Sequence, residues 1–166
     1  GTYYIPPLTV EQNVFELIKY KLNSLLQMYS IKDNSNILIT TQSTSGINQI
    51  QNNSIDYIFT DPPFGYNIEY SELSFVAETW LKVKTNNREE AVINKTQKKT
   101  LSEYQKLMEK CFRTYCRALK PGRWITIAFH NSQNSIWNSI QEALSKVGFI
   151  VADVRILDKK RESLNQ

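Results

Sequence analysis

The stretch "IDYIFTDPPFGYN", residues 55–67, runs a short apolar segment directly into an acid and two prolines. The apolar segment predicts a strand over 56–60 that is buried on both faces, as parallel strands are. Pro62 and Pro63 remove two consecutive backbone donors and fix φ at both positions, so the strand has to end there. Asp61 precedes a proline, which favours extended backbone and directs its carboxylate past the strand. The stretch therefore predicts an acid at the carboxyl end of a buried strand.

The rest of the chain alternates helices with strands. Helical periodicity predicts helices over 10–29, 69–82, 101–119 and 134–147, and capping-box pairs open two of them, Thr9 with Gln12 and Thr100 with Glu103. Further short strands are predicted over 36–41, 124–130 and 149–158, with "KPG" (120–122) ending the third helix and Gly148 the fourth. This alternation predicts an α/β fold with a parallel sheet. In such sheets ligands bind beyond the carboxyl ends of the strands, where Asp61 and His130 both fall.

Composition sets broad limits on the class of protein. The chain has 166 residues and a net charge of +4, which fits one globular domain and allows an anionic partner without requiring one. No apolar run of transmembrane length and no signal peptide are found, so a cytoplasmic protein with no membrane partner is the default expectation. Cys111 and Cys116 lack neighbouring metal ligands, and we interpret them as core thiols, with no metal site expected.

The run "TDPPF" (60–64), preceded by "NSID" and followed by "LKPGRWITIAFH" (119–130), resembles the catalytic half of the S-adenosylmethionine-dependent amino-methyltransferases of DNA. Their signature is (D/N/S)-P-P-(Y/F/W), and the resemblance extends from about residue 34 to 158. The longer run "TDPPFGYNIEYSEL" is similar to the subset found as large bacterial proteins. The resemblance implies methylation of N6 of adenine or N4 of cytosine in DNA. It also implies a Rossmann-like methyltransferase fold, a mostly parallel sheet with helices on both faces, incomplete in this chain.

The resemblance assigns catalytic roles to Asp61, Pro62, Pro63 and Phe64. The Asp61 carboxylate and the Pro62 carbonyl would accept hydrogen bonds from the target amino group, while Phe64 stacks on the extruded base. The two prolines would hold this geometry in advance. An aspartate at the first position favours DNA bases over protein glutamine. The alternative is that the prolines only end a strand and that Asp61 caps a neighbouring helix.

The cofactor site implied by the resemblance is missing from the sequence. Such enzymes hold S-adenosylmethionine with a glycine-rich turn, and the five glycines of this chain, at 1, 46, 65, 122 and 148, are too far apart to form one. We therefore expect residues 1–166 to be a fragment of a larger methyltransferase, with the rest of the parent polypeptide as its partner and the isolated chain inactive. Thr41, Gln42 and Asp61 are candidate cofactor contacts; an ordinary polar strand end is the alternative at 41–42.

Six further residues are candidate DNA contacts. They are Tyr66, Tyr70, Lys95, Lys98, Lys99 and His130. The two tyrosines would line the base pocket or pack under the next helix, and His130 would contact base or phosphate or be a structural histidine. The lysines belong to a polar loop over 83–99 that would follow the DNA backbone or be merely solvated.

Two other functions stay open at this point. One is methylation of RNA or of a protein glutamine by the same kind of motif. The other is a non-catalytic nucleic-acid-binding subunit with a degenerate methyltransferase fold, which the absent glycine-rich turn would allow.

Overall fold

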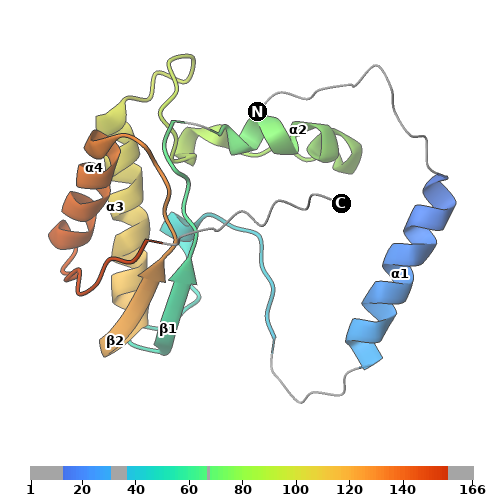
Figure 1. The fold of residues 1–166 in the computed structure, drawn as a ribbon, viewed down its shortest axis with the longest axis horizontal. Coiled ribbons are helices and arrows are strands. Elements are labelled where there is room, and N and C mark those ends of the chain that lie inside the picture. Colours follow the sequence, from blue (N-terminus) through green and yellow to red (C-terminus); the bar gives the residue numbers. More distant parts are fainter. Residues whose placement is uncertain (1–12, 31–36, 67, 157–166) are drawn as a thin grey trace, which may run out of the picture. The chain divides into compact units, whose positions relative to one another are not determined.

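The computed structural model describes residues 13–30, 37–66 and 68–156. The chain divides into two units, residues 2–41 and residues 42–166. In the first unit, helix α1 (Val14–Ser30) confirms the predicted helix, and its side chains over 14–27 are exposed (Figure 1). The capping box predicted for this helix, at residues 9–12, lies outside the described residues. No described helix combines the length and the apolar composition that a membrane crossing requires.

The second unit contains the motif. Its elements in chain order are η1 (Thr44–Gly46), β1 (Ile55–Thr60), α2 (Tyr70–Leu81), η2 (Asn87–Glu89), α3 (Leu101–Ala118), β2 (Leu119–Ile127) and α4 (Asn134–Lys146). The three helices confirm the predicted ones within a few residues. The Thr100–Glu103 capping box is formed at the start of α3, and Gly148 follows α4 with a φ of +97° that favours glycine.

The two strands pair in parallel, which brings their carboxyl ends to one edge. Thr60 at the end of β1 pairs with Ile127 at the end of β2, and the Ala128 amide donates to the Thr60 carbonyl at 2.9 Å. Asp61 and the residues after Ile127 therefore leave the sheet side by side. Figure 1 shows α2 beyond this same edge.

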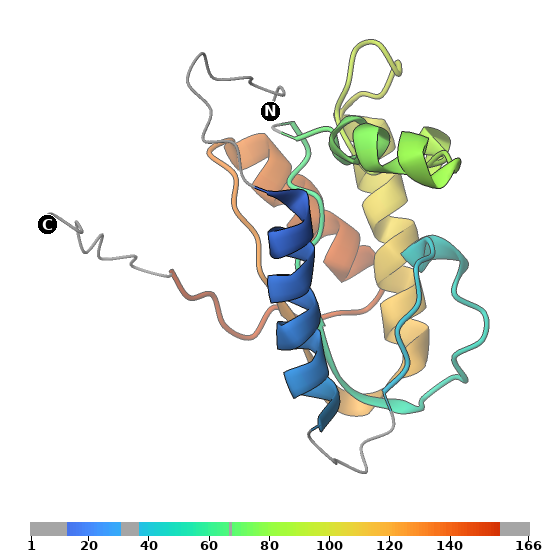
Figure 2. The same cartoon turned by 90° about the vertical axis from the view of Figure 1, so that its right-hand side faces the viewer.

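Helices α3 and α4 lie side by side and form the core of this unit with the inner face of the sheet (Figures 1 and 2). The stripe predicted for α3 supplies Tyr104, Met108 and Phe112, each 1% exposed or less. The α4 stripe adds Ile136, Ile140, Ala143 and Leu144, and Ile127 packs against this cluster. Cys111 and Cys116 are half-buried free thiols, and burial raises the pKa of Cys111.

The sheet differs from the prediction. Residues 37–41 and 149–156 form no strand, and Leu38, Ile39 and Ile150 are largely exposed, so two of the four predicted strands are not formed over the described residues. The outer ends of these predictions, residues 36 and 157–158, lie outside the described residues. A strand exists only through hydrogen bonds to a neighbour, which an apolar segment cannot supply by itself. The structure shows a two-stranded parallel sheet, which is compatible with part of a methyltransferase fold.

The "KPG" segment is a second correction. Helix α3 already ends at Ala118, and β2 begins at the next residue, so that Pro121 and Gly122 lie inside the strand. The register shifts there, between the pairs Ile55–Leu119 and Tyr57–Trp124. A bulge of this kind accommodates proline, which has no donor for the ladder, and the positive φ of Gly122.

Helices on both faces of the sheet were also expected. Within the described part of residues 42–166, α3 and α4 cover one face. On the opposite face Tyr57, Phe59 and Trp124 are 54–65% exposed. Side chains alternate along a strand, so these three share that face. In this unit no described helix covers that opposite face.

Candidate active site

Asp61 is the first residue after β1, and its side chain is exposed. Pro62 is buried, while Pro63 and Phe64 are half-buried. The strand thus carries the acid out of the sheet while the following residues turn back toward the core. The strand ends where the proline pair predicts, with the acid exposed just beyond it.

The backbone after Asp61 is held by three parts of the fold. The hydroxyl of Tyr104 on α3 donates to the Pro63 carbonyl at 2.7 Å. The side-chain amide of Asn131 donates to the Phe64 carbonyl at 2.7 Å. The backbone amide of Ile93 donates to the Gly65 carbonyl at 2.7 Å. Three successive carbonyls of the motif therefore accept hydrogen bonds from residues far away in sequence.

Aromatic contacts fix the ring of Phe64. It lies edge-on to Phe129 with a centroid distance of 5.6 Å and edge-on to His130 at 6.4 Å. Phe129 in turn lies edge-on to Trp137 of α4 at 4.9 Å. Such T-shaped pairs each stabilise by about 1 kcal/mol beyond burial. The structure thus brings the predicted residue His130 next to the predicted residue Phe64.

Asn131 joins the backbone contacts to the aromatic ones. It is 8% exposed, and its carbonyl accepts a hydrogen bond from the Trp137 indole at 2.8 Å. Its side-chain oxygen accepts from the Gln133 amide at 2.7 Å, so both ends of the side chain are paired. Asn131 therefore ties Phe64 to the start of α4.

The predicted tyrosines lie on the chain that leaves the motif. Tyr70 is the first residue of α2, and its pKa is raised first by partial burial and second by the negative charge of Asp61. Tyr70 therefore lies within electrostatic reach of the acid. Tyr66 is 53% exposed.

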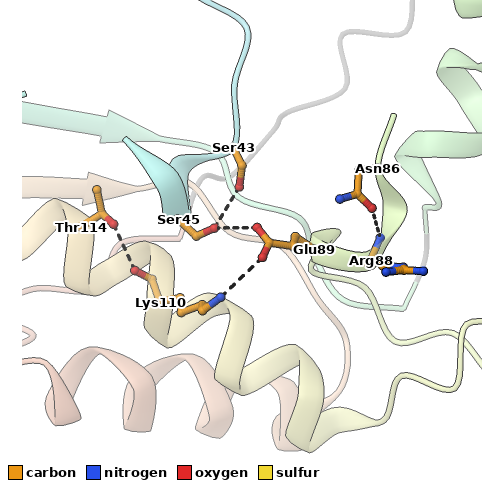
Figure 3. A network of polar contacts seen from close by, with 7 residues as sticks. All are labelled: Ser43, Ser45, Asn86, Arg88, Glu89, Lys110 and Thr114. Carbon is orange, nitrogen blue, oxygen red and sulfur yellow. Dashed lines mark hydrogen bonds and ion pairs between the residues drawn. The ribbon is translucent and has the colours of Figure 1, made fainter. Parts of the chain in front are cut away.

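The loop over 83–99 is firmly attached on several sides. Glu90 accepts hydrogen bonds from the amide and the hydroxyl of Ser71, at 2.9 and 2.7 Å, which satisfies a free donor in the first turn of α2. Figure 3 shows Glu89 between the Ser45 hydroxyl at 3.3 Å and the Lys110 ammonium of α3 at 3.6 Å. These contacts place Ile93 where its amide meets the motif.

The three predicted loop lysines differ in orientation. Lys95 and Lys98 are exposed in the turn closed by the Asn94–Lys99 bridge. The Lys99 ammonium instead donates to the carbonyls of Asn87 and Glu90, at 2.6 and 2.5 Å. Burial lowers the pKa of Lys99, against the opposing charge of Glu90. Lys99 is thus engaged within the loop.

Comparison with known proteins places this geometry in a family. The family model for DNA methylases of the N6/N4 type matches residues 55–166, two thirds of the chain. The chain belongs to the DNA methylase family. Comparison with curated proteins found no match, and neither did comparison with solved structures. The matched region of this DNA methylase begins at β1 and includes the whole motif, α3, β2 and α4.

Family membership confirms the resemblance noted in the sequence. It makes the chain a DNA methyltransferase in general terms, with DNA as substrate and a methyl donor as cofactor. The individual site residues of this DNA methylase stay predictions. Asp61, Phe64 and His130 lie at the carboxyl edge of the sheet, and Tyr70 begins α2 within reach of the charge of Asp61.

The described residues of this DNA methylase do not fit the predicted cofactor site. Thr41 and Gln42 lie in an exposed segment without strand pairing, so neither stands at a strand end. Of the four described glycines, Gly65, Gly122 and Gly148 have positive φ, but none begins a strand-turn-helix with a second glycine nearby. We therefore assign no step of the reaction through the cofactor. Over the described ranges no cluster of His, Cys, Asp or Glu suits a metal ion.

Sequence reasoning missed two residues of this site in the DNA methylase. Tyr104 was predicted only as part of a helical stripe, and Asn131 had no predicted role. Asn131 directly follows His130, the last residue of the predicted strand, which was a usable sign of its position at the sheet edge. The hydroxyl of Tyr104 was a signal, since a buried tyrosine usually finds a hydrogen-bond partner, but Tyr115 on the same stripe carries the same signal.

Proposed function

We propose that this chain holds the exocyclic amino group of adenine (N6) or cytosine (N4) in DNA for methylation, with S-adenosylmethionine as the methyl donor. The observation that carries the proposal is the arrangement of the motif. Pro63, Phe64 and Gly65 are held through their carbonyls, whereas Asp61 is exposed at the strand end. No described residue donates a hydrogen bond to the Pro62 carbonyl. The exposed Asp61 carboxylate is therefore open to a ligand, and the Pro62 carbonyl, although its residue is buried, is the second acceptor that we propose.

The chemistry of the amino group explains why acceptors are needed. Its lone pair is delocalised into the aromatic ring, so the nitrogen is a weak nucleophile. Acceptors beside the two N–H bonds favour the pyramidal form, in which the lone pair is free to attack a methyl group. Acceptors that are already in place cost no reorganisation during the reaction. The Asp61 carboxylate and the Pro62 carbonyl supply such a pair.

Phe64 serves the base itself. A base inside a duplex is out of reach, so an enzyme of this kind extrudes it and stacks it on an aromatic side chain. The ring of Phe64 has one edge contact with Phe129 and one with His130, an arrangement that fixes its orientation. A fixed ring loses little conformational entropy when the base arrives.

The experiment that tests this function measures methyl transfer from labelled S-adenosylmethionine to unmethylated DNA by the complete protein, with Asp61→Ala and Asp61→Asn. We expect both variants to lose at least about 100-fold in rate, because each removes a charged acceptor. Digestion to nucleosides distinguishes N6-methyladenine from N4-methylcytosine. RNA and a glutamine-containing peptide are offered in parallel, and labelling of either in place of DNA would favour that alternative.

Asp56→Asn is the matched control. Asp56 is an exposed acid on the same strand, but it is ion-paired with Lys120 and Arg123 near the opposite end of the sheet. We expect it to keep the wild-type rate. Unchanged methyl transfer in Asp61→Ala would refute the proposed role. DNA binding without any methyl transfer by the wild type would instead support a non-catalytic nucleic-acid-binding subunit.

A further inference from the structure

The three hydrogen bonds to the motif share a property that a simple strand end does not need. Each is made to a backbone carbonyl, and the three donors come from α3, from the segment after β2 and from the 83–99 loop. The carbonyls belong to Pro63, Phe64 and Gly65, directly after the predicted acceptors Asp61 and Pro62. A chain end that only had to leave the sheet would be adequately solvated by water.

Both side-chain donors are themselves buried. Tyr104 is 0% exposed and Asn131 is 8% exposed, so a lost bond at either would remove the protein donor from the carbonyl of a half-buried residue, Pro63 or Phe64. Tyr104 and Ile136 also surround Gly65, whose hypothetical Cβ would lie 3.5 Å from the Tyr104 ring and 3.4 Å from Ile136. The motif backbone is thus bonded and closely packed on the same side.

We infer that Tyr104 and Asn131 are positioning residues, which fix the backbone from Pro63 to Gly65 and through it the Pro62 carbonyl and the Phe64 ring. This inference rests on the proposed function and deepens it. Neither side chain would touch the base. Both act by setting the direction of an acceptor and of a stacking ring before the base arrives. A displacement of either group by about 1 Å costs about 100-fold in rate.

Tyr104→Phe tests this with the smallest change. It removes the hydroxyl that bonds Pro63 and leaves the buried ring in place. The matched control is Tyr115→Phe on the same helix, which removes a hydroxyl bonded at 3.1 Å to the Thr60 side chain and touches no motif carbonyl. Both variants lose one tyrosine hydroxyl bond between α3 and the β1 region, so losing such a bond does not by itself explain a rate loss confined to Tyr104→Phe.

The first readout is kinetic. In the complete protein, we expect Tyr104→Phe to reduce the single-turnover rate of DNA methylation about 10- to 100-fold. The apparent KM for S-adenosylmethionine should stay unchanged. Tyr115→Phe should keep the wild-type rate. Equal rates in the two variants would overturn the inference.

The second readout needs no activity. The Ile93 amide is bonded to the Gly65 carbonyl at 2.7 Å, so its hydrogen exchange reports whether the end of the motif is held. We expect Tyr104→Phe to accelerate exchange at Ile93 while the amides of the β1–β2 ladder keep their protection, and Tyr115→Phe to change neither. If the wild type shows no methyl transfer, the proposed function fails, and this comparison alone decides whether Tyr104 holds the motif.

A variant at the second donor protects the test against a failure of Tyr104→Phe to fold. Asn131→Asp removes the amide donor to Phe64 but keeps the oxygen that accepts from Gln133. Its control is Ser139→Ala, which removes another buried hydrogen bond, 2.9 Å to the Ser135 carbonyl within α4. A loss of rate and of Ile93 protection in Asn131→Asp but not in Ser139→Ala supports the inference. Equal behaviour overturns it.

Discussion

The hydroxyl of Tyr104 donates to the carbonyl of Pro63 across 41 residues of sequence, with a donor–acceptor distance of 2.7 Å. This bond joins the buried face of α3 to the D-P-P-F motif. Only the neutral phenol can donate it. Burial, with a smaller contribution from Tyr70, raises the pKa of Tyr104 well above its ordinary value of 10.0.

A first prediction concerns alkaline pH. Because the pKa of Tyr104 is higher in the folded than in the unfolded chain, its contribution to stability is fully present below about pH 10 and is lost as pH rises above it. Tyr104→Phe should therefore be less stable than wild type by about 1 kcal/mol at neutral pH, and its stability should fall less steeply above pH 10. Urea unfolding between about pH 8 and pH 11 measures both. Parallel pH curves would contradict the assignment.

A second prediction concerns Gly65. Its φ of +93° is one that residues with a side chain rarely adopt, and an added Cβ would meet Ile136, Ile93 and Tyr104 at 3.4–3.5 Å. Gly65→Ala should destabilise the fold by about 1–3 kcal/mol. Gly46→Ala is the control, because a Cβ there meets nothing within 4 Å. Thermal unfolding of both variants measures the difference, and similar midpoints would show that the Gly65 backbone relaxes without cost.

A third prediction concerns Arg117 near the end of α3. Its guanidinium donates to the carbonyls of Ile47 and Ile50 and to the side chain of Asn52, at 2.6–2.8 Å. A lysine has one compact ammonium and cannot reproduce this fork. Arg117→Lys should therefore destabilise the fold by about 1–3 kcal/mol, since the carbonyls of the half-buried residues Ile47 and Ile50 lose a donor.

Arg113→Lys is the control for that experiment. Arg113 lies one turn earlier on α3 and is exposed, and among the described residues it bonds only Glu109 of the same helix, at 2.7 Å. We expect a change of less than about 0.5 kcal/mol in its free energy of unfolding. Equal losses in the two variants would mean that the segment over 47–52 does not depend on Arg117.

A fourth prediction concerns DNA binding. Lys95 and Lys98 are exposed in the turn after Asn94, and as phosphate contacts each would add about 0.9 to the salt dependence of affinity. Replacing both by alanine should weaken binding and make the slope of log K against log salt shallower by about 1–2. Lys146→Ala, at the exposed end of α4, should leave the slope unchanged. A wild-type slope in the double variant would exclude the turn from the interface.

Local sequence was sufficient for several elements. Helix α3 was predicted with its capping box because a helix depends on contacts three and four residues apart, which the sequence states directly. The end of β1 was predicted for a similar reason, since the two prolines act on their own backbone. The position of Asp61 follows from that end, while the catalytic roles of Asp61 and Phe64 came from the family resemblance and stay predictions.

Strand pairing was beyond the sequence. Residues 37–41 and 149–156 are as apolar as many strands, yet neither forms a strand in the described structure, because a strand is stabilised by a neighbour that is distant in sequence. The bulge at Pro121 and Gly122 was missed for the same reason. The predicted position of Thr41 and Gln42 at a strand end depended on one of these strands, which the described structure does not form.

The sequence by itself determined the helices, the point where β1 ends and the acid placed there, since each depends on neighbouring residues. Only the tertiary structure decided which side chains bond the backbone that follows this acid. Tyr104 and Asn131 reach the motif from 41 and 67 residues away, and only the packing of α3 and α4 on the sheet brings their donors to its carbonyls.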